Sequence, residues 1–166
     1  MQIGVIEIFR SLQGESRFSG LPALFIRLAG CNLRCSYCDT PHSHENGRPT
    51  DIDELMNIVI NARGIDHVAV TGGEPLLQPN VYMLVDRLLV AGQKVLLETN
   101  GAVCLKYVPA EVIKIVDVKT PSSGAAGSFD LENLSLVGPG DEYKFVISSE
   151  HDLRFTFDFI QRYLRF

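Results

Sequence analysis

The chain has 166 residues, of which 46% are hydrophobic and 21% charged, and its 20 acidic and 15 basic side chains give a formal net charge of −5. These values exclude a disordered or collagen-like chain, and the length predicts a single domain, residues 1–166, because each of two halves would be small for a core of its own. No apolar run approaches the roughly 18 residues of a membrane span, and an acidic chain lacks the basic surface typical of nucleic-acid-binding proteins, so we expect neither a membrane nor a nucleic acid as partner.

Six strands are predicted, each an apolar run bounded by turn residues. They cover residues 5–9, 24–28, 67–71, 94–99, 113–118 and 143–147. Two stretches predict loops: residues 41–49 are polar, and residues 120–140 are rich in Ser, Gly and Ala.

Three helices are predicted from apolar residues at helical spacing. The first follows Thr50, which we expect to cap its N-terminus, and stops at Gly64. The second covers about residues 79–91 before Gly92, and the third is the amphipathic segment 150–163.

Strands and helices alternate through the middle of the chain, and these strands are continuously apolar, which is typical of a parallel sheet covered by helices. The fold class is therefore α/β. In such sheets ligands gather at the carboxyl ends of the strands. The predicted strand ends carry polar motifs, namely Thr71-Gly72-Gly73-Glu74, Glu98-Thr99-Asn100-Gly101 and Asp117-Val118-Lys119. We therefore expect a functional site at this edge of the sheet.

The cysteines are unevenly distributed: Cys31, Cys35 and Cys38 lie within eight residues, and Cys104 stands 66 residues further along. Four cysteines allow disulfides, but the chain is long enough for a core without them, and its N-terminus shows neither the basic nor the apolar region of a secretory signal. We therefore expect reduced thiols and a cytoplasmic protein, with Cys104 as a buried free thiol.

The C-x3-C-x2-C spacing places three thiolates on one short loop and predicts a metal centre. A structural zinc site needs four ligands, commonly from two cysteine pairs, and the fourth would have to be Cys104, His42 or His44. Three cysteine ligands are instead typical of an iron–sulfur cluster in which one iron is left open, and a substrate or cofactor can bind to that iron.

The cysteine spacing, followed by Gly72-Gly73-Glu74-Pro75 at a strand end, resembles the radical S-adenosylmethionine (SAM) superfamily. Within that superfamily the chain looks like the 7-carboxy-7-deazaguanine synthase (QueE) family over nearly its whole length. The matching segments are, in order, residues 7–15, positions within 20–33, residues 38–40, 71–75, 98–101, 117–123 and 144–147.

The resemblance implies an abbreviated partial (β/α) barrel of the radical SAM type, with about six strands and three main helices. It also implies conversion of 6-carboxy-5,6,7,8-tetrahydropterin to 7-carboxy-7-deazaguanine with loss of ammonia, in queuosine biosynthesis. The implied cofactors are a 4Fe–4S cluster, SAM and Mg²⁺, and the implied partners are a flavodoxin- or ferredoxin-type electron donor and a second copy of the chain in a homodimer. Because the radical comes from the cofactor, no side chain is expected to be catalytic.

The resemblance also assigns roles to individual residues. Cys31, Cys35 and Cys38 would hold the cluster, and the Thr40 hydroxyl would bind Mg²⁺, which needs few protein oxygens when substrate and water complete its shell. The residues expected to contact SAM are Tyr37, Cys38, Asp39, Gly73, Asp117, Val118 and Lys119. Those expected to contact the substrate are Leu12, Gln13, Gly14, Arg27 and Thr71, with Glu15, Gly72, Glu98 and Asn100 as further candidates.

The glycines and Thr40 also have plainer interpretations. Gly72 and Gly73 would form an ordinary strand-to-helix turn, Glu74 would cap the helix that follows, and Thr40 would only start a turn.

The charged candidates have plainer interpretations as well. Arg27 is costly in an apolar strand unless it is paired, and its partner is either the substrate carboxylate or one of Glu7 and Glu15. Asp117 and Lys119 would form an ion pair at a strand end.

Two other functions fit part of the pattern. A glycyl-radical-enzyme activase shares the cysteine spacing and the short length but should lack Arg27 and the 7–15 motif. A non-catalytic zinc or iron–sulfur binding module would need only the cysteines. The C-terminal helix is expected to belong to the core or to a dimer surface.

Overall fold

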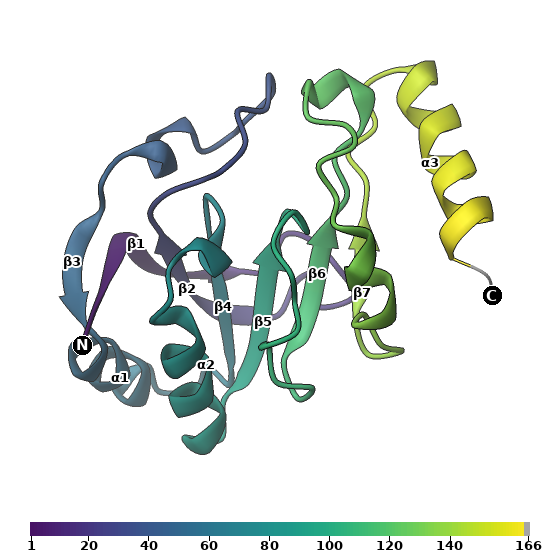
Figure 1. The fold of residues 1–166 in the computed structure, drawn as a ribbon. Coiled ribbons are helices and arrows are strands. Elements are labelled where there is room, and N and C mark those ends of the chain that lie inside the picture. The colour runs from purple at the N-terminus through teal and green to yellow at the C-terminus, as the bar shows by residue number, and fades with distance from the viewer. Residues whose placement is uncertain (165–166) are drawn as a thin grey trace.

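The computed structural model describes residues 1–164, and these residues form one seven-stranded sheet. Its strands are β1 (Gln2–Leu12), β2 (Pro22–Leu28), β3 (Arg48–Asp51), β4 (His67–Gly72), β5 (Lys94–Thr99), β6 (Ile113–Asp117) and β7 (Glu142–Lys144). Their order across the sheet is β3-β1-β2-β4-β5-β6-β7, so the sheet is open, with β3 and β7 at its edges (Figure 1).

Three α-helices accompany the sheet: α1 (Ile52–Asn61), α2 (Val81–Val90) and α3 (Glu150–Tyr163). Short 3-10 turns lie in the loops, namely η1 (Pro41–His44), η2 (Pro75–Leu77), η3 (Pro121–Ser123) and η4 (Leu131–Ser135). Among residues 1–164 there is no helix with the length and apolar character to cross a membrane.

Strands β2, β4, β5, β6 and β7 are neighbours in that order and run parallel, whereas β1 is antiparallel to both β2 and β3. Parallel neighbours end at the same edge of a sheet, so the carboxyl ends of β2, β4, β5 and β6 lie side by side (Figure 1). The predicted α/β class is confirmed, and the unclosed sheet is that of a partial barrel.

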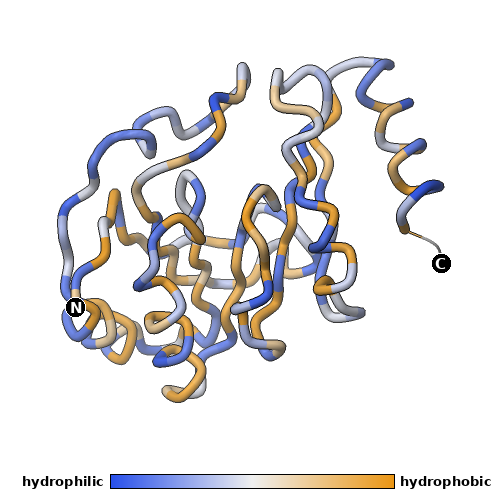
Figure 2. Tube along the Cα trace, viewed as in Figure 1, coloured by the Kyte–Doolittle hydropathy of each residue, from blue (hydrophilic) through white to orange (hydrophobic). Residues whose placement is uncertain are grey.

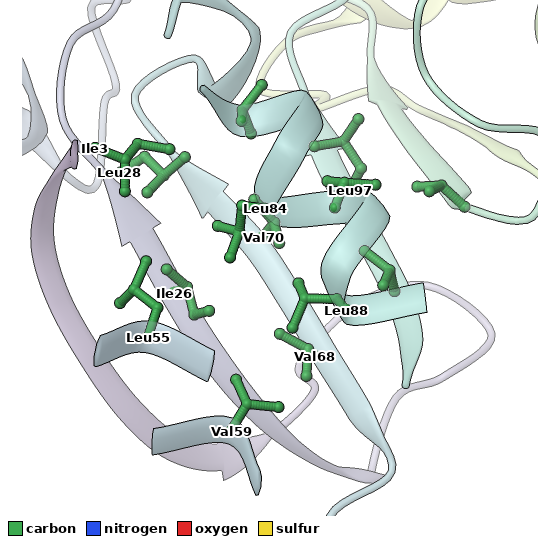
Figure 3. Packing of buried hydrophobic residues seen from close by; sticks show 14 of the residues in the cluster. Ile3, Ile26, Leu28, Leu55, Val59, Val68, Val70, Leu84, Leu88 and Leu97 are labelled. Atoms are coloured by element: carbon green, nitrogen blue, oxygen red, sulfur yellow. The ribbon is translucent and has the colours of Figure 1, made fainter. Parts of the chain in front are cut away.

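Alternation of side chains gives the sheet two different faces. One face packs against α1 and α2 in the main hydrophobic core (Figure 3). Buried residues there include Ile26, Val68, Val70 and Leu97 from the strands and Leu55, Leu84 and Leu88 from the helices. The opposite face carries a smaller apolar cluster, formed by Ala23, Phe25, Ala69, Leu96 and Ile115. In Figure 2 the hydrophobic colouring follows the strands and these two helices, while the segment before β3 is hydrophilic.

Helix α3 lies beyond β7, apart from α1 and α2 (Figure 1). Its Phe159 is buried and contacts the rings of Phe129, Tyr143 and Phe145. The helix is therefore attached to the edge of the sheet by an aromatic cluster, and Phe157 on another face is 56% exposed.

Strand β3 corrects the prediction of six strands, because it lies where a polar loop was predicted. It pairs through its backbone with residues 2–5 of β1, and three of its four residues are exposed or half-buried. An edge strand of this kind shows no apolar alternation that a sequence pattern could reveal. Pairing with β3 at its start and with β2 at its end extends β1 to residues 2–12 rather than 5–9, and β7 ends at Lys144 rather than at residue 147.

The predicted starts of two helices were also wrong. Thr50 belongs to β3, where it is buried and donates to the Arg48 carbonyl, and Asp51 caps α1 instead by accepting from the Asp53 amide. Helix α2 begins at Val81 because the turn η2 comes first. The predicted limits of α3, by contrast, are confirmed.

The core predicts a large effect of truncating Leu88, which has no exposed surface. Leu88→Ala leaves a cavity between α2 and the sheet, so the free energy of unfolding should fall by about 2–5 kcal/mol. The matched control is Val90→Ala on the same helix, where the side chain is 90% exposed, and the change there should stay within about 0.5 kcal/mol. Denaturant unfolding of both variants measures this, and equal effects would contradict the packing described.

Candidate active site

A cavity of about 600 Å³ lies at the carboxyl ends of β2, β4, β5 and β6. Its walls come from the end of β1 and the residues after it, from residues 29–40, here called the cysteine loop, and from the strand ends. Its size is that of a small-molecule site. A cavity is therefore present at the edge of the sheet where the site was expected.

Four side chains at the strand ends reach the cavity because they lie on the sheet face that α1 and α2 leave uncovered. They are Arg27, Thr71, Glu98 and Asp117, and each directly follows a buried core residue on its own strand. Arg27 is paired with Thr71 across β2 and β4, and the Thr71 hydroxyl donates to Glu98 Oε2 at 2.8 Å. Strand pairing thus brings together residues that are far apart in the sequence.

The cysteine loop leaves the end of β2 and places three thiols at the cavity wall. Cys31, Cys35 and Cys38 are free, half-buried thiols that all line the cavity. The loop is closed at its base by the Gly30 amide, which donates to the Ser43 carbonyl at 2.7 Å. All three cysteines of the predicted metal centre therefore border one cavity.

Gly72 and Gly73 bring the end of β4 into direct contact with the start of the cysteine loop. A Cβ on Gly73 would lie 2.2 Å from the Gly30 carbonyl oxygen and 2.7 Å from the Cβ of Cys31. A Cβ on Gly72 would lie 2.2 Å from the Leu28 carbonyl oxygen. The protein's own backbone therefore requires glycine at both positions, whatever else they contact.

Glu74, the next residue, ties the ends of β4 and β5 together. It has no exposed surface, and its carboxylate accepts hydrogen bonds from Thr99 Oγ1 at 2.9 Å, from the Asn100 amide at 2.7 Å and from the Leu76 amide at 3.0 Å. Burial raises the pKa of Glu74, and these hydrogen bonds offset part of the rise. Glu74 caps η2 as the plainer interpretation expected, and it also holds the strand ends in place.

The pKa of the Cys35 thiol depends on its burial and on the ionisable groups around it. Burial raises its pKa above the ordinary value, Lys119 lowers it, and Cys31 and Cys38 raise it again. Burial alone would lower the pKa of Lys119, but Asp117, 2.9 Å from Lys119 Nζ, outweighs it and raises that pKa. The ammonium group is therefore held in its charged form beside the thiols.

Asp117 is the centre of a chain of ion pairs along the cavity wall. Lys119 Nζ and Lys144 Nζ lie 2.9 and 3.5 Å from its Oδ2, and Lys144 also contacts Glu15 Oε2 at 2.6 Å. Within residues 1–164 the other oxygen, Oδ1, is buried and accepts no hydrogen bond. An oxygen without a hydrogen-bond partner is costly to bury, so the two ammonium groups on Oδ2 are what compensate the charge of this carboxylate.

Glu98 lies between the ends of β4 and β1. Its Oε1 accepts from Gln13 Nε2 at 2.9 Å and its Oε2 from the Thr71 hydroxyl. Gln13 is 3% exposed although it lies beyond the last strand residue of β1. The carboxylate therefore fixes the segment after β1 to the floor of the cavity.

Arg27 is paired with a carboxylate of the protein itself, which was one of the two predicted alternatives. Its Nε lies 2.6 Å from Glu7 Oε1 on the neighbouring strand, and His42 Nε2 lies 3.8 Å from the same oxygen. Arg27 also lines the cavity, so a ligand carboxylate there would compete with Glu7 for the guanidinium.

Tyr37, Asp39 and Thr40 form the far end of the cysteine loop and line the cavity. The Thr40 hydroxyl donates to Asp39 Oδ1 at 3.2 Å, and its carbonyl accepts from the Ser43 amide at the start of η1. Thr40 therefore does begin a turn, and it also lines the cavity, as Cys38 does.

The structure brings all the predicted site residues to the cavity wall except Val118. That side chain is buried, and the Val118 amide donates to the Lys144 carbonyl at 2.9 Å. The predicted residues that do line the cavity are Leu12, Gln13, Gly14, Glu15, Arg27, Cys31, Cys35, Tyr37, Cys38, Asp39, Thr40, Thr71, Gly72, Gly73, Glu98, Asn100, Asp117 and Lys119.

Lys144 and His44 are among the lining residues that had no predicted role. Lys144 was part of a matching motif, but its role depends on pairing with Asp117 and Glu15, which no local pattern shows. His44 lies in the segment predicted as a polar loop and is half-buried at the cavity, at the end of the turn η1 that follows Thr40. Cys104 lies elsewhere and is half-buried rather than buried, near Asp130.

Comparison with known proteins agrees with this geometry. The Radical SAM superfamily matches residues 25–165. A 7-carboxy-7-deazaguanine synthase of Koribacter versatilis is 46% identical over 160 residues, which are 96% of this chain and 71% of that protein. The chain belongs to the 7-carboxy-7-deazaguanine synthase family of the radical SAM superfamily.

Other relatives and a solved structure extend the comparison. The 7-carboxy-7-deazaguanine synthases of Thermoplasma acidophilum and Methanospirillum hungatei are 40% and 44% identical, and this chain spans 77% and 64% of their lengths. The crystal structure of QueE from Escherichia coli superposes with a TM-score of 0.80 at 24% identity, covering 98% of this chain and 79% of that one. The predicted resemblance and the partial-barrel fold are confirmed.

Radical SAM enzymes bind a 4Fe–4S cluster and SAM, and the cysteine loop of this family member fits such a cluster better than a single zinc ion. In the described chain the three sulfurs are not all within 4.8 Å of one another. A single zinc ion with bonds of about 2.3 Å requires sulfurs closer than this, whereas the irons of a cluster are bound separately at its corners. The donor set and its spacing therefore fit a cluster with three protein ligands.

The contact between Gly73 and the cysteine loop predicts a specific defect. Gly73→Ala should force the loop away from β4, lowering the free energy of unfolding by about 1–3 kcal/mol and reducing the iron bound after anaerobic reconstitution. Gly140→Ala is the matched control, because a Cβ there meets nothing within 4 Å. Iron analysis and denaturant unfolding measure both effects, and a Gly73→Ala protein that matches the control in both would contradict the contact.

Proposed function

We propose that this chain converts 6-carboxy-5,6,7,8-tetrahydropterin to 7-carboxy-7-deazaguanine with loss of ammonia. Membership of the family supports a radical SAM reaction in 7-deazapurine biosynthesis. The observation that carries the proposal is that one cavity of about 600 Å³ holds the three thiols and the polar strand ends together. The chain acts as a single radical SAM domain.

Cys31, Cys35 and Cys38 hold the 4Fe–4S cluster in this proposal. When bound together, the cluster and SAM supply one-electron chemistry that removes a hydrogen atom from the substrate. The side chains contribute binding, orientation and exclusion of water, and none of them is catalytic.

SAM is proposed to lie between the cysteine loop and the ends of β4 and β6. Tyr37, Cys38 and Asp39 contact it from the loop, and Gly73 contributes backbone groups only. At β6 Asp117 and Lys119 line the cavity, and we propose that their carboxylate and ammonium groups bind polar groups of the cofactor. Val118 contributes through its backbone, since its side chain is buried.

The substrate is proposed to lie nearer to β1 and β2. Arg27 binds its carboxylate in a forked hydrogen bond after exchanging Glu7 for the ligand. Thr71 and the backbone of residues 12–14 bind the edge of the pterin ring. Glu98 holds Thr71 and Gln13 in place through its two hydrogen bonds. Glu15, Gly72 and Asn100 complete the wall.

The partners follow from this chemistry. The reaction needs a small-molecule substrate and a reductant, for which we propose a flavodoxin- or ferredoxin-type protein, and neither nucleic acid nor membrane takes part. Free thiols at the site require a reducing compartment, so we place the enzyme in the cytoplasm. A homodimer is the proposed assembly.

Anaerobic turnover tests the proposal directly. The protein with reconstituted cluster, reductant, Mg²⁺ and SAM should convert 6-carboxy-5,6,7,8-tetrahydropterin to a product with the mass and absorption of 7-carboxy-7-deazaguanine. If SAM is cleaved without formation of a deazapurine, the substrate is wrong and the radical SAM chemistry stands. One zinc and no iron in the purified protein would overturn both.

The role proposed for Thr40 predicts how the turnover rate depends on the Mg²⁺ concentration. Its hydroxyl is the proposed protein ligand of Mg²⁺ next to the substrate, so Thr40→Ala should raise the Mg²⁺ concentration for half-maximal turnover by about tenfold or more, the loss of one oxygen ligand. Thr40→Ser keeps the hydroxyl and should resemble the unmodified protein. Steady-state rates over a Mg²⁺ titration decide the matter, and an unchanged half-maximal concentration in Thr40→Ala would remove Thr40 from this role.

A further inference from the structure

The cysteine loop is attached to the rest of the protein at two places. Its first half rests on the sheet: the Glu74 amide donates to the Gly30 carbonyl at 2.8 Å, and Gly73 lies against Cys31. Asn100 Nδ2 adds a hydrogen bond to Asn32 at 2.9 Å. The position of Cys31 therefore follows from the ends of β4 and β5.

The second half of the loop, which carries Cys35 and Cys38, has a different support. The Ser36 amide donates to the Ser123 carbonyl at 2.9 Å, and the Ser36 hydroxyl donates to the Ser122 carbonyl at 2.6 Å. Among the residues described, the hydrogen bonds that residues 35–39 make outside their own loop all go to segment 120–123. This half of the loop is therefore attached to the turn η3.

The turn η3 is in turn held by Asp152 in the first turn of α3. Asp152 is completely buried, and its Oδ1 accepts from the Ser122 amide at 2.7 Å. Its Oδ2 accepts from the Ser148 amide and from the Ser149 hydroxyl, both at 3.0 Å. One carboxylate thus joins α3, the segment before it and the turn that supports the cysteine loop.

This arrangement exceeds what a helix cap requires. Ser149 already caps α3 by accepting from the Asp152 amide, which uses the backbone of Asp152 and not its carboxylate. Burial by itself would raise the pKa of Asp152, but the hydrogen bonds from Ser122, Ser148 and Ser149 outweigh it and hold the pKa well below its ordinary value. The hydrogen bonds therefore favour the charged carboxylate, and hydrogen bonds to a charged acceptor are the strong ones.

We propose that Asp152 is a positioning residue for the metal centre, because it holds η3 against Ser36 and so sets the positions of Cys35 and Cys38 independently of Cys31. The inference rests on the proposed function only in taking these thiols as cluster ligands. It makes the C-terminal helix α3, which lies at the edge of the fold beyond β7 (Figure 1), part of the support of the site.

Site-resolved alkylation of the reduced, metal-free protein tests this without turnover. Asp152→Ala should increase the iodoacetamide reaction rates of Cys35 and Cys38 by about tenfold through local opening, whereas Cys31 and Cys104 should change by less than about twofold. Asp158→Ala, an exposed position on the same helix, is the matched control and should leave all four rates unchanged. Peptide mass spectrometry reads each cysteine separately.

Ser36 supplies a second variant that is exposed and does not belong to the core. Ser36→Ala removes only the bond to the Ser122 carbonyl and should accelerate Cys35 and Cys38 selectively, to a smaller extent, while Ser36→Thr keeps the hydroxyl and should restore the original rates. After reconstitution, iron loss to a chelator should be faster in Asp152→Ala and Ser36→Ala than in Asp158→Ala.

The outcomes separate the possibilities. Equal acceleration of all four cysteines in both variants, or no acceleration in either, overturns the positioning role. If Asp152→Ala does not fold, the Ser36 pair decides alone. The alkylation pattern does not depend on the substrate, so a failed turnover experiment with a selective pattern would reject the proposed reaction and leave the role of Asp152 standing.

Discussion

The close contact between the end of β4 and the start of the cysteine loop is the constraint on which the site depends. Gly73 lies against Gly30 and Cys31 with no space for a Cβ, so the position of β4 determines where the first thiol lies. Because β4 is also hydrogen-bonded to β2 and β5, the same strand places Thr71 beside Arg27 and within reach of Glu98. The first thiol of the cysteine loop and the polar strand ends of the cavity therefore share one rigid support, as accurate positioning of a site requires.

The arginine and the two lysines of the cavity wall are paired with carboxylates before any ligand enters. Arg27 contacts Glu7, and the two lysines of the wall contact Asp117, so few charges are buried without a partner. This balance explains how a chain with a net charge of −5 can provide cationic groups to an anionic ligand, since local pairing and not total charge sets the potential in a cavity. A ligand carboxylate that binds Arg27 must replace Glu7, so the loss of the Arg27–Glu7 ion pair reduces the binding free energy that it gains.

The support of the cysteine loop is divided between the central sheet and the last helix. Cys31 belongs to the sheet, while Cys35 and Cys38 are attached through Ser36 to η3 and from there to Asp152. Helix α3 packs against the sheet edge through the contact of Phe159 with Tyr143 of β7. A helix that the sequence predicts only as amphipathic is thus connected to the cysteine loop through hydrogen bonds, although Ser36 and Asp152 are more than a hundred residues apart in the chain.

The sequence alone determined the parts of this protein that depend on neighbouring residues. The limits of α3, the apolar strands β4 and β5, the cysteine spacing and the polar strand ends were all predictable, because periodicity, capping and motif spacing act over a few residues. Only the tertiary structure decided the rest. Strand β3 forms through backbone pairing at an edge, which leaves no pattern in its side chains, and the partnership of Lys144 with Glu15, like that of Asp152 with Ser122, joins residues that only the strand order and the packing of α3 bring together.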